Sequence, residues 1–141
     1  MANPSLKTGV LKQSAPLLER FFAVSDLIIM AVAFIVVHRV YLNSFEFTSE
    51  RLLVMLFALG ASYVVFVVGG VYQSRRGNFL LQEIGQLLVC LIFVALLTGL
   101  FAFLSKVAVE VSRMWFGWSL ILAFVCLSVF RIVLRLSLIH I

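Results

Sequence analysis

The stretch IGQLLVCLIFVALLTGLFAFLS occupies residues Ile84–Ser105 and contains no charged side chain, although Glu83 precedes it and Lys106 follows it. A helix needs about 20 mostly apolar residues to cross the roughly 30 Å hydrocarbon core of a bilayer. The stretch is continuously apolar rather than alternating, which favours a helix over a barrel strand. We therefore predict a transmembrane helix near residues 81–104.

Three further apolar stretches have the same character, and only one of them contains a charge, Asp26. They are Phe21–Val37, Leu52–Ser74 and Met114–Phe130. We predict spans near 18–41, 52–72 and 114–135. The short connections between them favour antiparallel neighbours. The predicted fold is therefore an all-α, four-helix transmembrane bundle over 17–135, preceded by a cytoplasmic N-terminal segment over 1–16.

The composition of the whole chain agrees with a membrane protein. Of 141 residues, 64% are apolar and 12% are charged, whereas a soluble domain has about 45–50% and about 25%. The mean hydropathy is +1.19. Such a small chain cannot hide this much apolar surface from water, which excludes a soluble domain and also a disordered chain. With 2 cysteines, a disulfide scaffold is excluded as well.

The net charge of +5 is explained by membrane topology, and we expect no nucleic-acid partner. Lysines and arginines gather in cytoplasmic loops. The N-terminal segment, the connection between the second and third spans and the C-terminal end hold Lys7, Lys12, Arg20, Arg75, Arg76, Arg131 and Arg135. The cations of the other two loops are nearly balanced by Glu46, Glu50 and Glu110. We therefore predict that both termini are cytoplasmic.

Asp26 is the one ionisable residue clearly inside a predicted span. It lies six residues after Arg20, which is about 9 Å along a helix and near the inner interface. A carboxylate in this environment requires a partner. We expect a structural contact with a hydroxyl of a neighbouring helix or with Arg75 or Arg76, and a proton relay or substrate site remains the alternative.

The other chemically active side chains indicate no catalytic, cofactor-binding or metal site. His38 stands beside Arg39 at the outer end of the first span, where an interfacial position explains it. Cys90 and Cys126 are interpreted as small packing residues. We predict an aromatic belt of Tyr41, Trp115 and Trp118 at the outer interface and Tyr72 at the inner one.

Four short polar patterns inside the apolar runs suggest a family. They are ERFFAVSDLII from Glu19, GGVYQSRRGNFLLQEI from Gly69, SRMWFGWSL from Ser112 and FRIVLR from Phe130. In this order they resemble the N-terminal membrane region of bacterial undecaprenyl-phosphate glucose or galactose phosphotransferases, the polyprenyl glycosylphosphotransferases that initiate exopolysaccharide synthesis. The resemblance covers roughly Leu17–Arg135.

The resemblance implies a multi-pass protein of the bacterial inner membrane that anchors a sugar transferase. In that family a later catalytic domain, with an Asp-Glu pair and a magnesium ion, moves a sugar 1-phosphate from a nucleotide sugar to undecaprenyl phosphate. None of those catalytic residues can be placed in this chain, so we expect the fragment to be inactive and to hold no cofactor. The implied partners are the lipid bilayer, undecaprenyl phosphate and polysaccharide assembly proteins, and an oligomer is compatible with the sequence.

Two other interpretations stay open. The chain could be a complete small membrane protein, such as a GtrA-like polyprenyl-sugar translocase or a small multidrug transporter. A transporter commonly places an acid near mid-span, where substrate can reach it, and Asp26 lies closer to one edge. A structural or assembly subunit is the third interpretation, which the sequence does not separate from an anchor.

The last residues, LSLIHI over Leu136–Ile141, form a distinct hypothesis. The codons CTG TCT CTT ATA CAC ATC encode this string and match a transposon end used to fragment DNA for sequencing. We interpret Leu136–Ile141 as translated adapter, in which case His140 has no biological role. An ordinary apolar tail is the alternative, and the nucleotide sequence distinguishes the two.

Overall fold

The structure is a computed structural model that describes residues 4–44, 46–73, 79–109 and 111–140, with side chains from residue 16 onward. Its elements are α1 (Pro4–Leu42), α2 (Ser49–Val68), α3 (Leu80–Leu104), the short 3-10 helix η1 (Val107–Val109) and α4 (Arg113–His140). No strand occurs within the described ranges. The predicted all-α fold with four membrane-length helices is confirmed.

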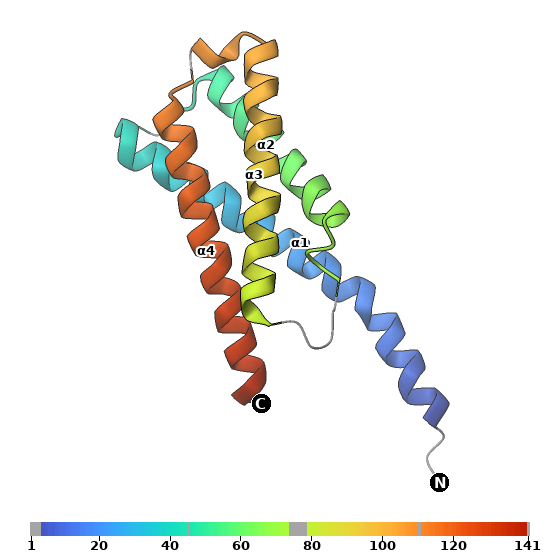
Figure 1. Cartoon of the computed structure of the whole chain (residues 1–141). Helices are drawn as coiled ribbons and strands as arrows, with labels where there is room; N and C mark the ends of the chain where they lie inside the picture. The colour runs from blue at the N-terminus through green and yellow to red at the C-terminus, as the bar shows by residue number, and fades with distance from the viewer. Residues whose placement is uncertain (1–3, 45, 74–78, 110, 141) are drawn as a thin grey trace.

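The two ends of the bundle differ in what they carry (Figure 1). At one end α1 enters, α2 connects to α3 and α4 finishes; we call this the terminal end. At the other end lie the connection from α1 to α2 and the short helix η1; we call this the η1 end. The two termini therefore share one end, as the topology prediction requires, while the side of the membrane on which that end lies remains a prediction.

Each long helix is apolar enough to span a bilayer. The most apolar windows have mean hydropathies of 2.3 within 16–42, 2.2 in α2, 2.9 in α3 and 2.2 in α4. Large apolar side chains point away from the bundle on all four helices, for example Ile28, Leu56, Leu96 and Val133. Surfaces of this kind are stable in lipid rather than in water. The chain is therefore a multi-pass membrane protein.

The end of α2 differs from the predicted second span. The helix stops at Val68, whereas the apolar pattern predicted a span to residue 72. Gly70 adopts a φ of +69°, a left-handed conformation that ends a helix and that glycine reaches without a steric penalty. The neighbouring Gly69 could not carry a side chain unchanged, because a Cβ there would lie 2.7 Å from Cys90 Sγ.

The first and last helices extend beyond their predicted spans. α1 begins at Pro4, so the predicted N-terminal segment 1–16 is helical from that residue and continuous with the first span. α4 continues to His140 through the suspected adapter residues. A helix there distinguishes neither origin of the tail, because an apolar tail and a translated adapter have the same side chains.

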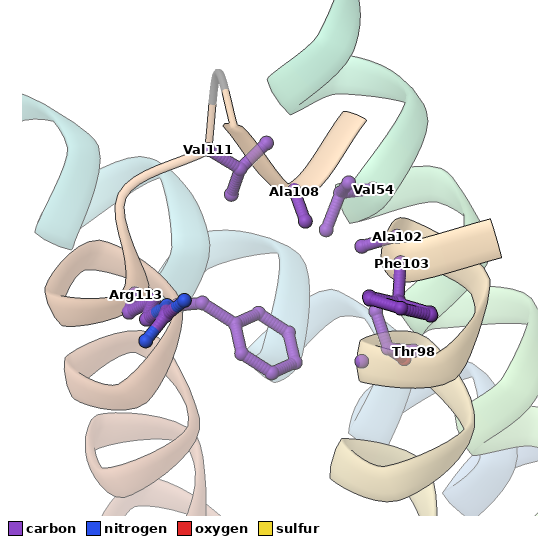
Figure 2. A pocket seen from close by; sticks show the side chains of 9 residues that line it. Val54, Thr98, Ala102, Phe103, Ala108, Val111 and Arg113 are labelled. Atoms are coloured by element: carbon purple, nitrogen blue, oxygen red, sulfur yellow. The ribbon is translucent and has the colours of Figure 1, made fainter. Parts of the chain in front are cut away.

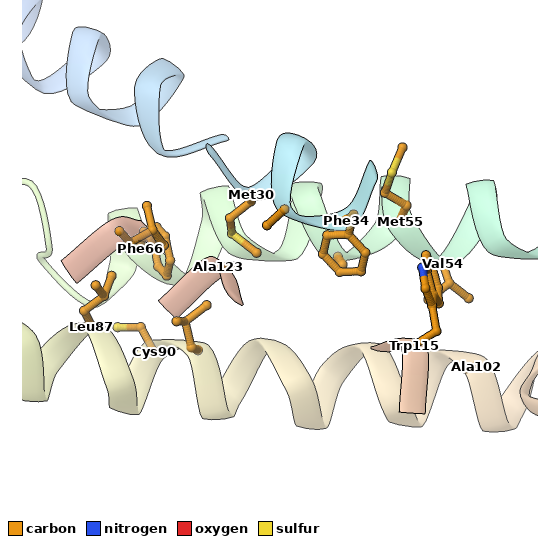
Figure 3. Close-up of a cluster of buried hydrophobic side chains, with 14 of the residues drawn as sticks. Met30, Phe34, Val54, Met55, Phe66, Leu87, Cys90, Ala102, Trp115 and Ala123 are labelled. Carbon is orange, nitrogen blue, oxygen red and sulfur yellow. The ribbon is translucent and has the colours of Figure 1, made fainter. Parts of the chain in front are cut away.

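Helix pairing is uneven. α1 packs most extensively against α4, and α2 packs mainly against α3. Buried side chains from all four helices meet along the middle (Figure 3). The largest of them are Trp115, Phe34, Phe66 and Met30, each fully buried. Trp115 and Phe34 join α4 to α1 through an edge-to-face ring contact with centroids 5.5 Å apart.

Candidate functional site: a buried ion pair at the terminal end

Asp26 of α1 and Arg131 of α4 form an ion pair inside the bundle. Arg131 Nη2 donates a hydrogen bond of 2.7 Å to Asp26 Oδ2. The Asp26 side chain is fully buried, and only 16% of the Arg131 side chain is exposed. An unpaired charge at this buried position would cost considerable free energy, and the ion pair neutralises both charges.

Two aromatic rings flank the arginine. The Arg131 Cζ atom lies 5.8 Å from the ring centroid of Phe22 and 5.8 Å from that of Tyr72. Both distances are within the range of cation–π attraction. Burial, followed by the nearby Asp26 carboxylate, raises the pKa of the Tyr72 phenol, so this hydroxyl stays protonated. Tyr72 also meets Phe66 edge to face, which connects the ion pair to the end of α2.

A second, weaker ion pair lies one helical turn further along α4. Arg135 Nη1 lies 3.6 Å from Glu83 Oε2 of α3, and about two fifths of each side chain is exposed. Gln86 on the next turn of α3 donates a hydrogen bond to the carbonyl of Gly69. These contacts attach the end of α4 and the α2–α3 turn to the first turns of α3.

A cavity of about 330 Å³ opens beside these groups, and Tyr72, Glu83, Arg131 and Arg135 are among its lining residues. Its two cations face Asp26 and Glu83, so the described charges balance. Balanced, mutually bound charges suit the fixing of helices more than the capture of a charged substrate. The arrangement therefore holds α4 against α1 and α3.

The sequence identified Asp26 but not its described partner. The charge pattern marks Arg131 only as a cytoplasmic cation, because a partner 105 residues away leaves no local pattern. The predicted partners Arg75 and Arg76 lie outside the described residues, so that part of the prediction stays untested. Tyr72, predicted to belong to the aromatic belt at the inner interface, lies against the arginine at the terminal end.

At the η1 end, His38 is not the interfacial residue that the sequence suggested. It is 1% exposed, and its ring stacks on Phe47 with centroids 3.8 Å apart. Its Nε2 lies 3.0 Å from the carbonyl oxygen of Glu46. The connection from α1 to α2 folds back over His38, which hydropathy alone does not reveal. Trp115, also expected at the interface, is fully buried beside it.

Within the described part of the chain, no three histidine, cysteine, aspartate or glutamate side chains lie close enough together to hold a metal ion. Magnesium would need several oxygen ligands around one point. Asp26 is bound to Arg131, and Glu83 lies near Arg135. These residues do not fit a magnesium ion.

The fold and the buried ion pair define a four-helix, multi-pass membrane protein. A protein-family model described as a CoA-binding domain matches residues 67–141, more than half of the chain. The chain therefore belongs to this family, whose domain is found in members of the sugar transferase family. No curated protein and no solved structure matches the chain.

The described residues within the matched region do not fit coenzyme A. A nucleotide phosphate is normally held by backbone amides at a helix start or by converging cations. Here the start of α3 is apolar around Phe79 and Leu80, and its first turn carries the acid Glu83. Arg131 lies against Asp26 at the terminal end, and Arg113 begins α4 at the η1 end. The family match therefore shows membership of the family and does not show that this chain binds a cofactor.

Proposed function

We propose that this chain is the membrane-anchoring region of a bacterial sugar transferase of the inner membrane. The parent protein would move a sugar 1-phosphate from a nucleotide sugar to undecaprenyl phosphate and so initiate exopolysaccharide synthesis. The single observation that carries the proposal is the family match over 67–141, because the matched domain is found in sugar transferases. The motif resemblance over Leu17–Arg135 adds the particular reaction.

The role proposed for the bundle is to hold a catalytic domain at the membrane and to orient it. α4 is the last helix, and ion pairs through Arg131 and Arg135 hold two successive turns of its second half against α1 and α3. A helix fixed at two successive turns leaves the membrane in a defined direction. A catalytic domain joined to it would then face the headgroups of its lipid substrate. Undecaprenyl phosphate and polysaccharide assembly proteins are the proposed partners.

The test compares the chain with the longer product of its gene. Membranes containing the chain alone are incubated with labelled nucleotide sugars, magnesium and undecaprenyl phosphate, and the lipid fraction is counted. We expect no transfer above membranes without the chain. The product of the downstream reading frame is expected to transfer label, and transfer by the chain alone would contradict the proposal.

A polyprenyl-sugar translocase or a small multidrug transporter is the rival outcome. Asp26, the acid that such a mechanism would use, forms a 2.7 Å ion pair with Arg131. We therefore expect cells expressing the chain to extrude cationic dyes no faster than cells expressing the Asp26→Asn variant. A difference between the two, together with a natural stop codon after Arg135, would favour the transporter.

A further inference from the structure

A second cavity lies at the opposite end of the bundle, between α3, η1 and the start of α4 (Figure 2). Its volume is about 260 Å³. Most of its wall is apolar and includes Val54, Ala102, Val111 and Phe116. Phe103 at its edge is 74% exposed, so the cavity reaches the outer surface of the bundle.

Two polar side chains line this cavity. Thr98 of α3 is 1% exposed, and its Oγ1 has no hydrogen-bond partner among the described residues. A buried hydroxyl without a partner costs free energy that a bound acceptor or donor would recover. Figure 2 shows the Thr98 side chain on the α3 side of the cavity, below Phe103.

Arg113 supplies the charge. It is the first residue of α4, it is exposed, and it lies across the cavity from the α3 residues Ala102 and Phe103 (Figure 2). No acidic side chain is among the described residues that line the cavity, so this lining carries one positive charge. The η1 helix and Val111 stand above the space, and Ala108 of η1 points into it.

From this arrangement we infer that the cavity binds an anionic phospholipid. The phosphate lies at Arg113, an ester oxygen accepts the hydrogen bond of Thr98 Oγ1, and one acyl chain occupies the apolar space between α3 and α4. This order of cation, hydroxyl and apolar wall matches the order of phosphate, ester and hydrocarbon in a phospholipid. The inference is independent of the sugar transferase proposal, because it uses only residues at the η1 end.

A soluble anion fits the same residues less well. One exposed arginine attracts a free phosphate only weakly in water. The apolar wall would add nothing to such binding, whereas it contributes in proportion to the hydrocarbon that it covers. A bilayer also presents the lipid at this depth, at the end of two spans.

The binding is measured by native mass spectrometry on the purified chain after exchange into mixed micelles of phosphatidylglycerol and phosphatidylcholine. We expect about a fivefold preference for phosphatidylglycerol, the effect of one arginine on an anionic lipid. The variant Arg113→Gln is expected to bind both lipids equally. Arg39→Gln is the matched control, because Arg39 is an exposed arginine at the η1 end that bonds to Asn43 and does not line the cavity.

A separate variant tests the proposed position of the acyl chain. A Cβ added at Gly99 meets no atom within 4 Å, and Gly99 lines the cavity, so Gly99→Leu fills the space without a clash on the backbone side. We expect this variant to retain less of both lipids than Gly60→Leu, whose site is equally open and lies on α2 outside the cavity. Equal lipid retention in these two variants would overturn the inference. So would an unchanged preference in Arg113→Gln, or displacement of the lipid by inorganic phosphate.

Discussion

A carboxylate that leaves water for an apolar helix bundle loses most of its hydration, and a bound cation with good hydrogen-bond geometry offsets much of the loss. Asp26 is in this position, since its side chain is fully buried and Arg131 Nη2 lies 2.7 Å from Oδ2. The arginine in turn lies between the rings of Phe22 and Tyr72. One acid, one base and two rings therefore connect three parts of the chain that are distant in sequence.

At the residue scale we predict that Asp26→Asn lowers the free energy of unfolding by about 3 kcal/mol, because it leaves Arg131 without its counter-charge. The measurement is unfolding in mixtures of mild detergent and dodecyl sulfate, followed by helicity. The matched control is Glu83→Gln in the second pair, where both side chains are about two fifths exposed and a loss below about 1 kcal/mol is expected.

A double-mutant cycle completes this test. Removing both charges, as Asp26→Asn with Arg131→Gln, is expected to cost less than the sum of the two single changes, because no unpaired charge then remains. Additive costs would show that the two side chains do not interact, and the ion pair would have to be abandoned.

How far the sequence predicts this site depends on the chemistry of each residue. A lone acid in an apolar run can be recognised in the sequence, because the apolar neighbours that make its burial unfavourable are adjacent to it in the chain. Its partner is not visible, since Arg131 occupies an ordinary position near the end of a span and 105 residues separate the two. His38 shows the reverse case: a histidine beside Arg39 suggests an interface, and only the fold-back of the connection from α1 to α2 buries it.

At the scale of the element, the end of α2 depends on two adjacent glycines with different constraints. Gly70 needs its backbone freedom, with a φ of +69°. Gly69 needs its small size, because a Cβ would lie 2.7 Å from Cys90 Sγ and 2.9 Å from the carbonyl oxygen of Val65. A side chain at residue 69 would therefore force Cys90 or the end of α2 to shift.

One pair of substitutions compares the turn glycine Gly70 with Gly60, a helical glycine in open space. Gly70→Ala is expected to lower the free energy of unfolding by about 1–2 kcal/mol, because a side chain is strained in the left-handed region. Gly60→Ala, in the middle of α2 with open space around it, is expected to raise it by up to about 1 kcal/mol through higher helix propensity. The same detergent unfolding measures both. A gain in stability at Gly70 would contradict the turn.

Span positions were predictable because hydrophobic length is a strong and local signal. The third span, predicted near 81–104, is Leu80–Leu104 in the structure. The second was predicted near 52–72 and is Ser49–Val68 in the structure. Its end was placed too late, since Val71 and Tyr72 are apolar enough to continue a hydropathy run, whereas the backbone had already turned at Gly70. Hydropathy reports whether a segment prefers lipid or water, whereas the backbone dihedral angles determine where the helix ends.

At the scale of the whole molecule, the lysines and arginines divide between the two ends of the bundle. Arg20, Arg131 and Arg135 line cavities beside Tyr72 and Gln73, at the terminal end. The chain also enters and leaves the bundle at this end (Figure 1). The positive-inside rule predicts that this end lies in the cytoplasm. The proposed anchoring function needs the same orientation, because nucleotide sugars are cytoplasmic.

A reporter fused after Arg135 tests the orientation. Green fluorescent protein at this position is expected to fluoresce, and alkaline phosphatase at the same position is expected to be inactive. Fusions within 106–112 provide the matched control and should give the opposite pattern. Active phosphatase after Arg135 would reverse the topology and would also exclude a cytoplasmic catalytic domain at that end.

The pairing of α1 with α4 has a consequence for biosynthesis. The ribosome adds about 5–20 residues per second, so Arg131 emerges roughly 5–20 s after Asp26. Until then the first helix holds an acid whose counter-charge has not been translated, and its main packing partner does not exist. During this interval we expect Asp26 to stay near the headgroups, to remain within the insertion machinery or to be protonated. α1 is therefore the first helix to be synthesised, and its most extensive packing, against α4, forms last.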